Sequence, residues 1–386
     1  MNKPASRHVL LLVDDDAENI EIVNSILCEK YEVRVATNGV KALELVNRQP
    51  TPSLILLDVI MPHMDGYEVC KHLKENPMTR DIPVIFLTGK TDVTDETRGF
   101  EVGAVDYIHK PFSPPIVKAR VRTHLMLRDA HETVAVQLAT INSELEMARQ
   151  VQLSILPAEI PDLPGLEIVA RYLPMSSVAG DFYDFLVVDD KHLGILIADV
   201  AGHGLPSALI ASMLQNALAW QSPHASDPGQ VLSELNRAMT GKFERHFVTA
   251  AYLFVDMENG ILKYAGAAHT PLLLWQAKLR RATEFIENGL MLGPFAGATY
   301  SSLSFPLERG DRIVLFTDGV IEVENSSGED FGVERVRQVL ESKHDLRPGR
   351  FVDALLYGLS GWSETAIGSS QSDDITLLVI DFEASA

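Results

Sequence analysis

The chain is poor in cysteine, in positive charge and in long apolar runs, and each shortage excludes a class of protein. Its 386 residues include only Cys28 and Cys70, too few for a disulfide framework, which favours reduced thiols in a cytoplasmic protein. Lysine and arginine total 33 against 53 acidic residues, and the net charge of −20 argues against a nucleic-acid-binding surface. The run Val9–Val13 is too short for a signal peptide or a membrane span. We therefore expect a soluble cytoplasmic protein with neither nucleic-acid nor membrane partners.

Length and composition are those of a folded, multidomain protein. With 46% hydrophobic and 22% charged residues the chain can build proper cores, and its length suggests two or three domains. The patterns described below predict an α/β protein with one domain over residues 1–125, a helical linker over 126–160 and a second domain over 161–386.

Residues 8–125 alternate short apolar runs with amphipathic stretches, which is typical of a doubly wound parallel sheet with helices on its faces. Ligands bind such folds at the carboxyl ends of the strands. The predicted strands are Val9–Val13, Tyr31–Val35, Leu54–Leu57, Val84–Leu87 and Tyr107–Ile108.

Three acidic residues are expected at that edge of the first sheet. Asp58 closes the apolar run Leu54–Leu57, and Asp14 and Asp15 follow the first strand. Like-charged carboxylates held together form a ready cation site. Thr88 ends another strand, and a lysine, Lys110, precedes Pro111; a lysine and a hydroxyl beside an acidic pocket suit an aspartyl phosphate.

On these residues, positions 8–125 resemble a response-regulator receiver domain. The resemblance implies that Asp58 accepts the phosphoryl group from a sensor histidine kinase or a phosphotransfer protein. It also implies that Asp14, Asp15, Asp58 and the Ile60 carbonyl hold Mg²⁺. Thr88 and Tyr107 match the switch pair of that family, and Lys110 matches its lysine.

The stretch from Pro114 to about Ser154 contains neither glycine nor proline after Pro115, and its composition favours a helix. Forty residues of helix would span roughly 60 Å. Its apolar residues follow heptad-like spacings, which favours a parallel coiled coil in a homodimer; the alternative is a helix packed on the flank of a neighbouring domain. The stripe consists of Leu127, Val134, Leu138, Ile141, Leu145 and Ala148, and His131 interrupts it.

Three prolines at 157, 161 and 164 end the helix, and the remaining chain is rich in predicted strands with helices between them. Two sheets with helices outside, an α/β sandwich, are expected. The strand candidates are Leu166–Tyr172, Phe182–Val188, Leu193–Asp199, Val248–Asp256, Ile261–Ala265, Leu272–Trp275, Arg312–Thr317 and Ile375–Phe382. The helix candidates are Pro206–Trp220, Gly229–Glu244, Val333–Ser342 and Arg350–Ser360.

Four short acidic motifs stand at the ends of these apolar runs. Carboxylates gathered from distant strands repel one another unless a cation lies between them, and hard oxygen donors suit Mg²⁺ or Mn²⁺. Each motif alone is also a common turn or helix cap, so the prediction depends on all of them together. The motifs are Gly180-Asp181-Phe182-Tyr183-Asp184, Asp199-Val200-Ala201-Gly202-His203-Gly204, Thr317-Asp318-Gly319 and Asp373-Asp374-Ile375-Thr376.

Residues 145–384 resemble the metal-dependent serine/threonine protein phosphatases of the PPM type, in particular the bacterial sporulation and stress-response branch. The resemblance implies two Mn²⁺ or Mg²⁺ ions bridged by Asp199, with the Val200 carbonyl also a ligand. Asp318 and Asp373 would hold one ion and Asp181 would lie on the other side of the site. The alignment favours Asp373 over Asp374 as the ligand. The implied substrate is a phosphorylated anti-sigma-factor antagonist of the STAS type in a partner-switching pathway.

The sequence departs from that family at two places, where Gly266-Ala267-Ala268-His269 replaces Asn-Ala-Gly-His and Val178-Ala179-Gly180 replaces Val-Gly-Gly. Both lie outside the expected ligands. Two functions stay in competition: a phosphatase controlled by the receiver, and a silent phosphatase fold that sequesters a sigma-factor regulator. A silent relative is expected to lack some of the four ligand aspartates, and all four are present. No motif supports a nucleotidyl cyclase or another receiver output.

Overall fold

The computed structural model describes residues 8–89, 93–175, 178–202, 204–243, 246–286, 288–365 and 373–383. The chain forms two compact units, Met1–Ile141 and Asn142–Ala386. Within the described residues, none of the helices combines the length and apolar character that a membrane crossing requires.

The first unit is built on one parallel sheet with strand order β2-β1-β3-β4-β5. Strands β1, β3 and β4 are buried along their whole length, because helices cover both faces of the sheet. Helices α2 and α3 pack on one face, and α1 and the start of α5 pack on the other. The elements are β1 (Val9–Val13), α1 (Ala17–Leu27), β2 (Glu32–Ala36), α2 (Gly39–Val46), β3 (Leu54–Asp58), α3 (Gly66–Glu75), β4 (Val84–Thr88), α4 (Val93–Glu101), β5 (Asp106–His109) and α5 (Pro114–Leu153).

Side-chain caps set where two of these helices begin. Asp16 accepts a hydrogen bond from the backbone N–H of Glu18 and so starts α1 directly after the acidic pair at the end of β1. Asp65 and Glu68 form a capping box at the start of α3. Both caps lie at the edge of the sheet where Asp14 and Asp58 lie, and they fix the loops that surround this edge.

The second unit has two sheets. One has the order β13-β10-β9-β8-β7 with β14 added to β10, and the other has the order β12-β11-β15-β16-β6. The strands are β6 (Leu166–Leu173), β7 (Phe182–Val187), β8 (His192–Val200), β9 (Val248–Asp256), β10 (Ile261–Ala267), β11 (Leu272–Gln276), β12 (Arg281–Phe285), β13 (Asn288–Gly289), β14 (Leu303–Pro306), β15 (Arg312–Phe316) and β16 (Ile375–Phe382). The helices are α6 (Leu205–Ala219), η1 (Ser222–His224), α7 (Pro228–Met239), η2 (Asp318–Val320), α8 (Gly332–Ser342) and α9 (Pro348–Ser363).

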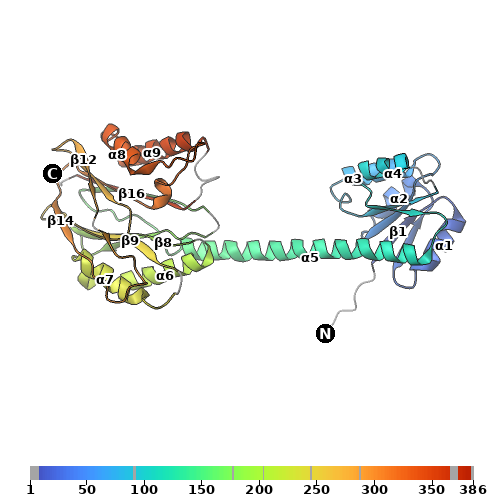
Figure 1. Ribbon diagram of the computed structural model, residues 1–386, viewed down its shortest axis with the longest axis horizontal. Coiled ribbons are helices and arrows are strands. Elements are labelled where there is room, and N and C mark those ends of the chain that lie inside the picture. The colour runs from blue at the N-terminus through green and yellow to red at the C-terminus, as the bar shows by residue number, and fades with distance from the viewer. Residues whose placement is uncertain are drawn as a thin grey trace. The chain divides into compact units, whose positions relative to one another are not determined.

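The two sheets and their helices form a four-layer sandwich, as predicted. Alternate residues of β8 face opposite ways: Leu193, Ile195 and Ile197 lie in the core between the sheets, whereas Leu196 and Ala198 pack toward α6 and α7. Helices α8 and α9 cover the outer face of the other sheet (Figure 1). Both faces of each central strand are therefore buried, which explains its nearly continuous apolar sequence.

The five-stranded parallel sheet and the long helix are confirmed as predicted, whereas some short strands and element bounds differ. Strands β12, β13 and β14 were not predicted: β13 has only two residues, and β12 and β14 expose residues such as Arg281 and Ser304 instead of forming a continuous apolar run. The helix predicted over Gly229–Glu244 ends at Met239. Thr240 leaves the helical conformation there, and its hydroxyl donates to the carbonyl of Asn236 one turn earlier.

Candidate functional sites

The predicted acidic residues of the first unit lie together at the carboxyl edge of its sheet. Strands β1 and β3 are neighbours with Val13 beside Leu57. Asp14 follows Val13 and Asp58 follows Leu57, so the two aspartates lie at the same end of adjacent strands. One carboxylate oxygen from each of Asp14, Asp15 and Asp58 lies within 4.8 Å of the others. Asp14 is fully buried and Asp58 is 5% exposed, whereas Asp15 is exposed to solvent.

Lys110 joins the two buried carboxylates. Its Nζ lies 2.9 Å from Asp14 Oδ2 and 3.1 Å from Asp58 Oδ1. Burial, and then the charge of Asp14, raise the pKa of Asp58 above its ordinary value, although Lys110 opposes this shift. Burial lowers the pKa of Lys110, but its bonds to the two aspartates outweigh burial and the net shift is upward. The peptide bond between Lys110 and Pro111 is cis.

The remaining receiver residues surround this group. Thr88 ends β4, the strand beside β3, and is buried. Ile60 lies two residues beyond Asp58 with an exposed side chain. Tyr107 on β5 is 5% exposed and points inward, with its ring 5.5 Å from Phe86 and 5.3 Å from Phe100 between ring centres.

Two glycines make this arrangement possible, and neither role was predicted from the sequence. A Cβ on Gly66 would lie 2.2 Å from the carbonyl oxygen of Asp58, so only glycine allows α3 to begin so close to it. A Cβ on Gly99 would lie 1.5 Å from the hydroxyl of Tyr107. The inward position of Tyr107 therefore requires glycine at position 99 of α4.

In the second unit, three of the four predicted aspartates approach one another at one end of the sandwich. Strands β15 and β16 are antiparallel neighbours, which places Asp318, two residues after β15, beside Asp373, two residues before β16. Asp199 belongs to β8 in the other sheet, with Val200 buried beside it. Burial, then the charges of Asp318 and Asp373, raise the pKa of Asp199 to about 8. Burial and the charge of Asp373 likewise raise the pKa of Asp318 to about 6.

A further carboxylate, which was not predicted, joins this group. Oxygens of Asp318, Glu322 and Asp373 lie within 4.8 Å of one another. The short helix η2 brings Glu322 back, since its N–H donates to the carbonyl of Asp318 at 2.9 Å. An acidic residue four positions after Asp318, on a turn of helix, was the available signal in the sequence.

Asp181 lies deeper than the other three. It is 2% exposed, and its Oδ2 accepts hydrogen bonds from the hydroxyls of Thr317 at 2.7 Å and Thr376 at 2.5 Å. Burial and the nearby Asp199 raise the pKa of Asp181 well above its ordinary value. The structure therefore buries Asp181 more deeply than the carboxylate group and binds it to Thr317, which precedes Asp318, and to Thr376 in β16.

Asp374 and Asp373 differ in their surroundings. Asp374 accepts hydrogen bonds from the N–H groups of Met175 and Gly180, each at 2.7 Å, and so holds the loop that leads to Asp181. Asp373 lies in the carboxylate group. A Cβ on Gly180 would lie 2.7 Å from the carbonyl of Val200, so this glycine lets the two motif loops approach closely. His203 lies outside the described residues.

His269, in the motif that departs from the family, is buried beside the strand that carries Asp199. Its Nδ1 lies 3.0 Å from Thr249 Oγ1, and Thr249 pairs with Asp199 across β8 and β9. Burial lowers the pKa of His269 to about 3, so its ring is neutral. It therefore supports the strand pair without adding charge to the site.

The residues present in both units fit divalent cations. The donors are carboxylate oxygens, which are the hard ligands that Mg²⁺ and Mn²⁺ prefer. Burial, and then the mutual repulsion of the carboxylates, raise the pKa of Asp199 and of Asp318, and a bound cation would relieve that repulsion.

The end of helix α5 contacts the loop of the Asp181 motif. Gln152 is 6% exposed; its side-chain N–H donates to the carbonyl of Ala179, and its Oε1 accepts from the N–H of Ala179 at 2.9 Å. Ala179 precedes Gly180 and Asp181 directly. The end of α5, which belongs to the second unit, thus contacts the backbone of that unit's site loop.

Two family models match the chain, one within each of its two compact units. The family model described as stage II sporulation protein E (SpoIIE) matches residues 189–383, and the response regulator receiver domain model matches residues 10–122. Phosphoserine phosphatase RsbU of Bacillus subtilis is 34% identical over 204 residues, which are 53% of this chain and 61% of that protein. The SiaA-PP2C domain of Pseudomonas aeruginosa is 25% identical with a TM-score of 0.57, covering 64% of this chain and 100% of that structure.

A probable cyclic di-GMP phosphodiesterase of Vibrio cholerae serotype O1 is 44% identical over 140 residues, which are 36% of this chain and 32% of that protein. The chain therefore spans about a third of this relative and about three fifths of RsbU. The similarity to the phosphodiesterase concerns a stretch about as long as the first unit alone.

Proposed function

Because this chain belongs to the stage II sporulation protein E (SpoIIE) family and has a receiver domain ahead of that region, we propose that it is a two-component response regulator in which phosphorylation of Asp58 controls a metal-dependent protein serine/threonine phosphatase. The observation on which the proposal depends is the gathering of carboxylates from separate strands at one end of the sandwich. The phosphoserine phosphatase RsbU, which is similar over half of this chain, supports a phosphorylated serine as substrate.

The ligand assignment is part of the proposal. Asp199 and the carbonyl of Val200 would join two Mn²⁺ or Mg²⁺ ions, with Asp318 and Asp373 on one ion and Asp181 toward the other. When bound, such ions acidify water and neutralise the charge of a phosphoryl group. Asp374 would hold the loop rather than an ion, since both of its oxygens accept backbone hydrogen bonds.

In the receiver, Asp58 would accept the phosphoryl group from a sensor histidine kinase or a phosphotransfer protein. Mg²⁺ would lie between Asp14, Asp15, Asp58 and the Ile60 carbonyl, and Lys110 would balance the added charge. Thr88 and Tyr107 would respond to the new phosphoryl oxygens. The contacts of Lys110 with both buried aspartates support this arrangement.

Control of the phosphatase would pass along helix α5. Its last turn holds Ala179 through both polar atoms of Gln152, and Ala179 adjoins the loop of Asp181. A shift or rotation of the helix would therefore move the backbone next to a proposed ligand. Helix α5 would then act as a bistable element that both sites can bias.

The remaining features follow from the family resemblance. We propose residues 126–160 as a dimer-forming linker between a receiver domain over 1–125 and a phosphatase domain over 161–386. The substrate would be an anti-sigma-factor antagonist of the STAS type in a partner-switching pathway, and the protein would act in the cytoplasm. The competing function is a silent adaptor that sequesters a sigma-factor regulator; the retained carboxylates favour the enzyme.

The test is Mn²⁺-dependent hydrolysis of a phosphoserine protein by the purified chain, with and without beryllofluoride to mimic phosphorylated Asp58. Activity that changes with beryllofluoride and disappears in Asp199→Asn supports the proposal. A folded protein without activity in either state would contradict it and favour the adaptor.

A further inference from the structure

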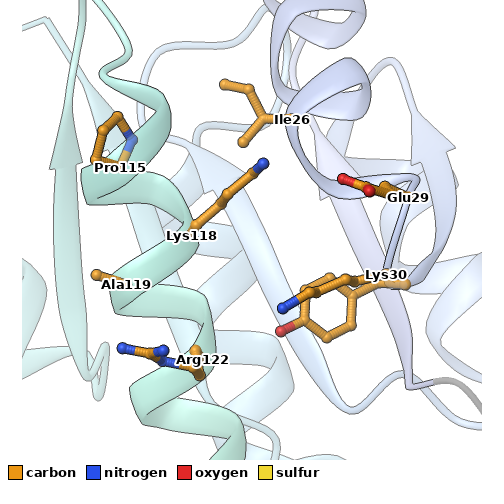
Figure 2. Close-up of a pocket in the computed structure, with 8 residues that line it drawn as sticks. Ile26, Glu29, Lys30, Pro115, Lys118, Ala119 and Arg122 are labelled. Carbon is orange, nitrogen blue, oxygen red and sulfur yellow. The ribbon is translucent and has the colours of Figure 1, made fainter.

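A cleft on the first unit is lined by positive side chains although the chain as a whole is strongly acidic. It encloses about 240 Å³ between the end of α1 and the first turns of α5. Figure 2 shows Lys30 from the α1 side and Lys118 from α5 extending into the space between these elements. Arg122 lines the same cleft one turn further along α5.

These three cations have no acidic partner in the part of the chain that the structure describes. None of Lys30, Lys118 and Arg122 has a carboxylate oxygen within 4.0 Å there, although Glu29 lines the same cleft. By contrast, Arg120, on the same helix, is paired with Asp106. Three unpaired positive charges from two elements create a local positive potential that favours an acidic ligand.

The walls between the cations are apolar. Ile26, Pro115 and Ala119 line the cleft with the positive residues (Figure 2), and Ile26 is 8% exposed. A ligand that fits must therefore offer carboxylates and apolar groups together. A small anion is less well matched, since sites for small molecules bury most of the ligand around precisely placed polar groups, and all three cations here are exposed.

We propose that this α1–α5 cleft is a docking surface for an acidic amphipathic helix of a partner protein. A groove between two elements suits a helix that lays an apolar stripe on Ile26, Pro115 and Ala119, with glutamates or aspartates reaching Lys30, Lys118 and Arg122. Charge complementarity of this kind sets specificity and the rate of association. The surface is separate from both carboxylate sites, so the inference does not depend on the proposed phosphatase activity.

The test measures binding of a fluorescent helical peptide, with glutamates and leucines on one face, to the full chain by anisotropy. The cleft variant is Lys30→Glu, Lys118→Glu and Arg122→Glu together. The control variant, Lys41→Glu, Arg48→Glu and Lys71→Glu, changes the net charge equally at exposed positions outside the cleft. We expect the cleft variant to weaken binding about tenfold and the control by less than about twofold.

Three results would overturn the docking surface. One is equal binding to both variants, and another is no binding of the peptide to the natural chain, with circular dichroism confirming that each protein is folded. The third is that inorganic pyrophosphate or vesicles of anionic lipid bind through the same three cations while the peptide does not. Loss of binding in the cleft variant alone, reduced further by salt, supports the proposal.

Discussion

At the scale of single residues, Asp199 links the stability of the metal-free protein to pH. Its pKa of about 8 in the folded protein exceeds the ordinary value of 3.8, so the folded state binds the proton more tightly than the unfolded chain. Its contribution to stability is complete below about pH 4 and is lost as pH rises through about 8. As pH rises from about 5 to about 8, we expect the free energy of unfolding to fall by about 1–3 kcal/mol less in Asp199→Asn than in the natural chain.

The measurement is denaturant unfolding in chelator at both pH values, followed by addition of Mn²⁺. The natural chain should regain stability with the metal at the higher pH, whereas Asp199→Asn should not. Asp190→Asn, at an exposed position between β7 and β8, is the control and should follow the natural chain. Parallel pH profiles for all three proteins would show that Asp199 does not set this dependence.

Gly99 controls where the side chain of Tyr107 can lie. The 1.5 Å separation between a Cβ at position 99 and the Tyr107 hydroxyl forces the ring out of its inward position in Gly99→Ala. We expect this variant to accept beryllofluoride at Asp58 but to lose at least about half of the resulting change in phosphatase activity. Gly358→Ala, where the added Cβ meets no atom within 4 Å, is the control. A full response in Gly99→Ala would mean that the inward ring has no part in control.

A residue of either candidate site could be predicted from the sequence only where it belongs to a recognisable motif. Asp14, Asp58 and Lys110 were predicted as one group from strand ends, and the structure brings them together. Gly99 and Gln152 gave no such signal, because a steric fit and a contact with Ala179 arise only from tertiary packing. The role of each metal ligand stays a prediction until an ion is bound there.

At the scale of elements, the end of α5 is the part most open to a test. Gln152→Ala removes both hydrogen bonds to Ala179 and leaves two buried backbone groups without partners. We expect a loss of about 1–3 kcal/mol of stability in the second unit and about a tenfold weaker apparent affinity for Mn²⁺ in the activity assay. Gln150→Ala, at an exposed position on the same helix, should change neither. Equal Mn²⁺ affinity in both variants would show that the contact between Gln152 and Ala179 does not support metal binding.

The sequence was most informative for elements whose faces are buried on both sides. Strands Leu54–Asp58 and Arg312–Phe316 contain the continuous apolar runs Leu54–Leu57 and Ile313–Phe316, because layers cover both of their faces, and both strands were predicted. The edge strands Arg281–Phe285 and Leu303–Pro306 have polar residues directed to solvent and were missed. Edge pairing depends on the neighbouring strand, which a local pattern does not report.

At the scale of the whole molecule, the proposed homodimer predicts which residues of α5 meet a second copy. Leu138 and Ile141 belong to the heptad-like stripe and are 55% and 51% exposed, whereas Val136 is 66% exposed and lies off the stripe. A charge at a buried seam position leaves it without a partner in an apolar surrounding. We expect Leu138→Lys to shift the mass measured by light scattering from dimer toward monomer and to weaken the response to beryllofluoride. Val136→Lys, with the same chemical change two residues away, should leave both unchanged. If the two variants behave alike, the stripe is not the seam, and coupling along α5 must work within one chain through the Gln152 contact.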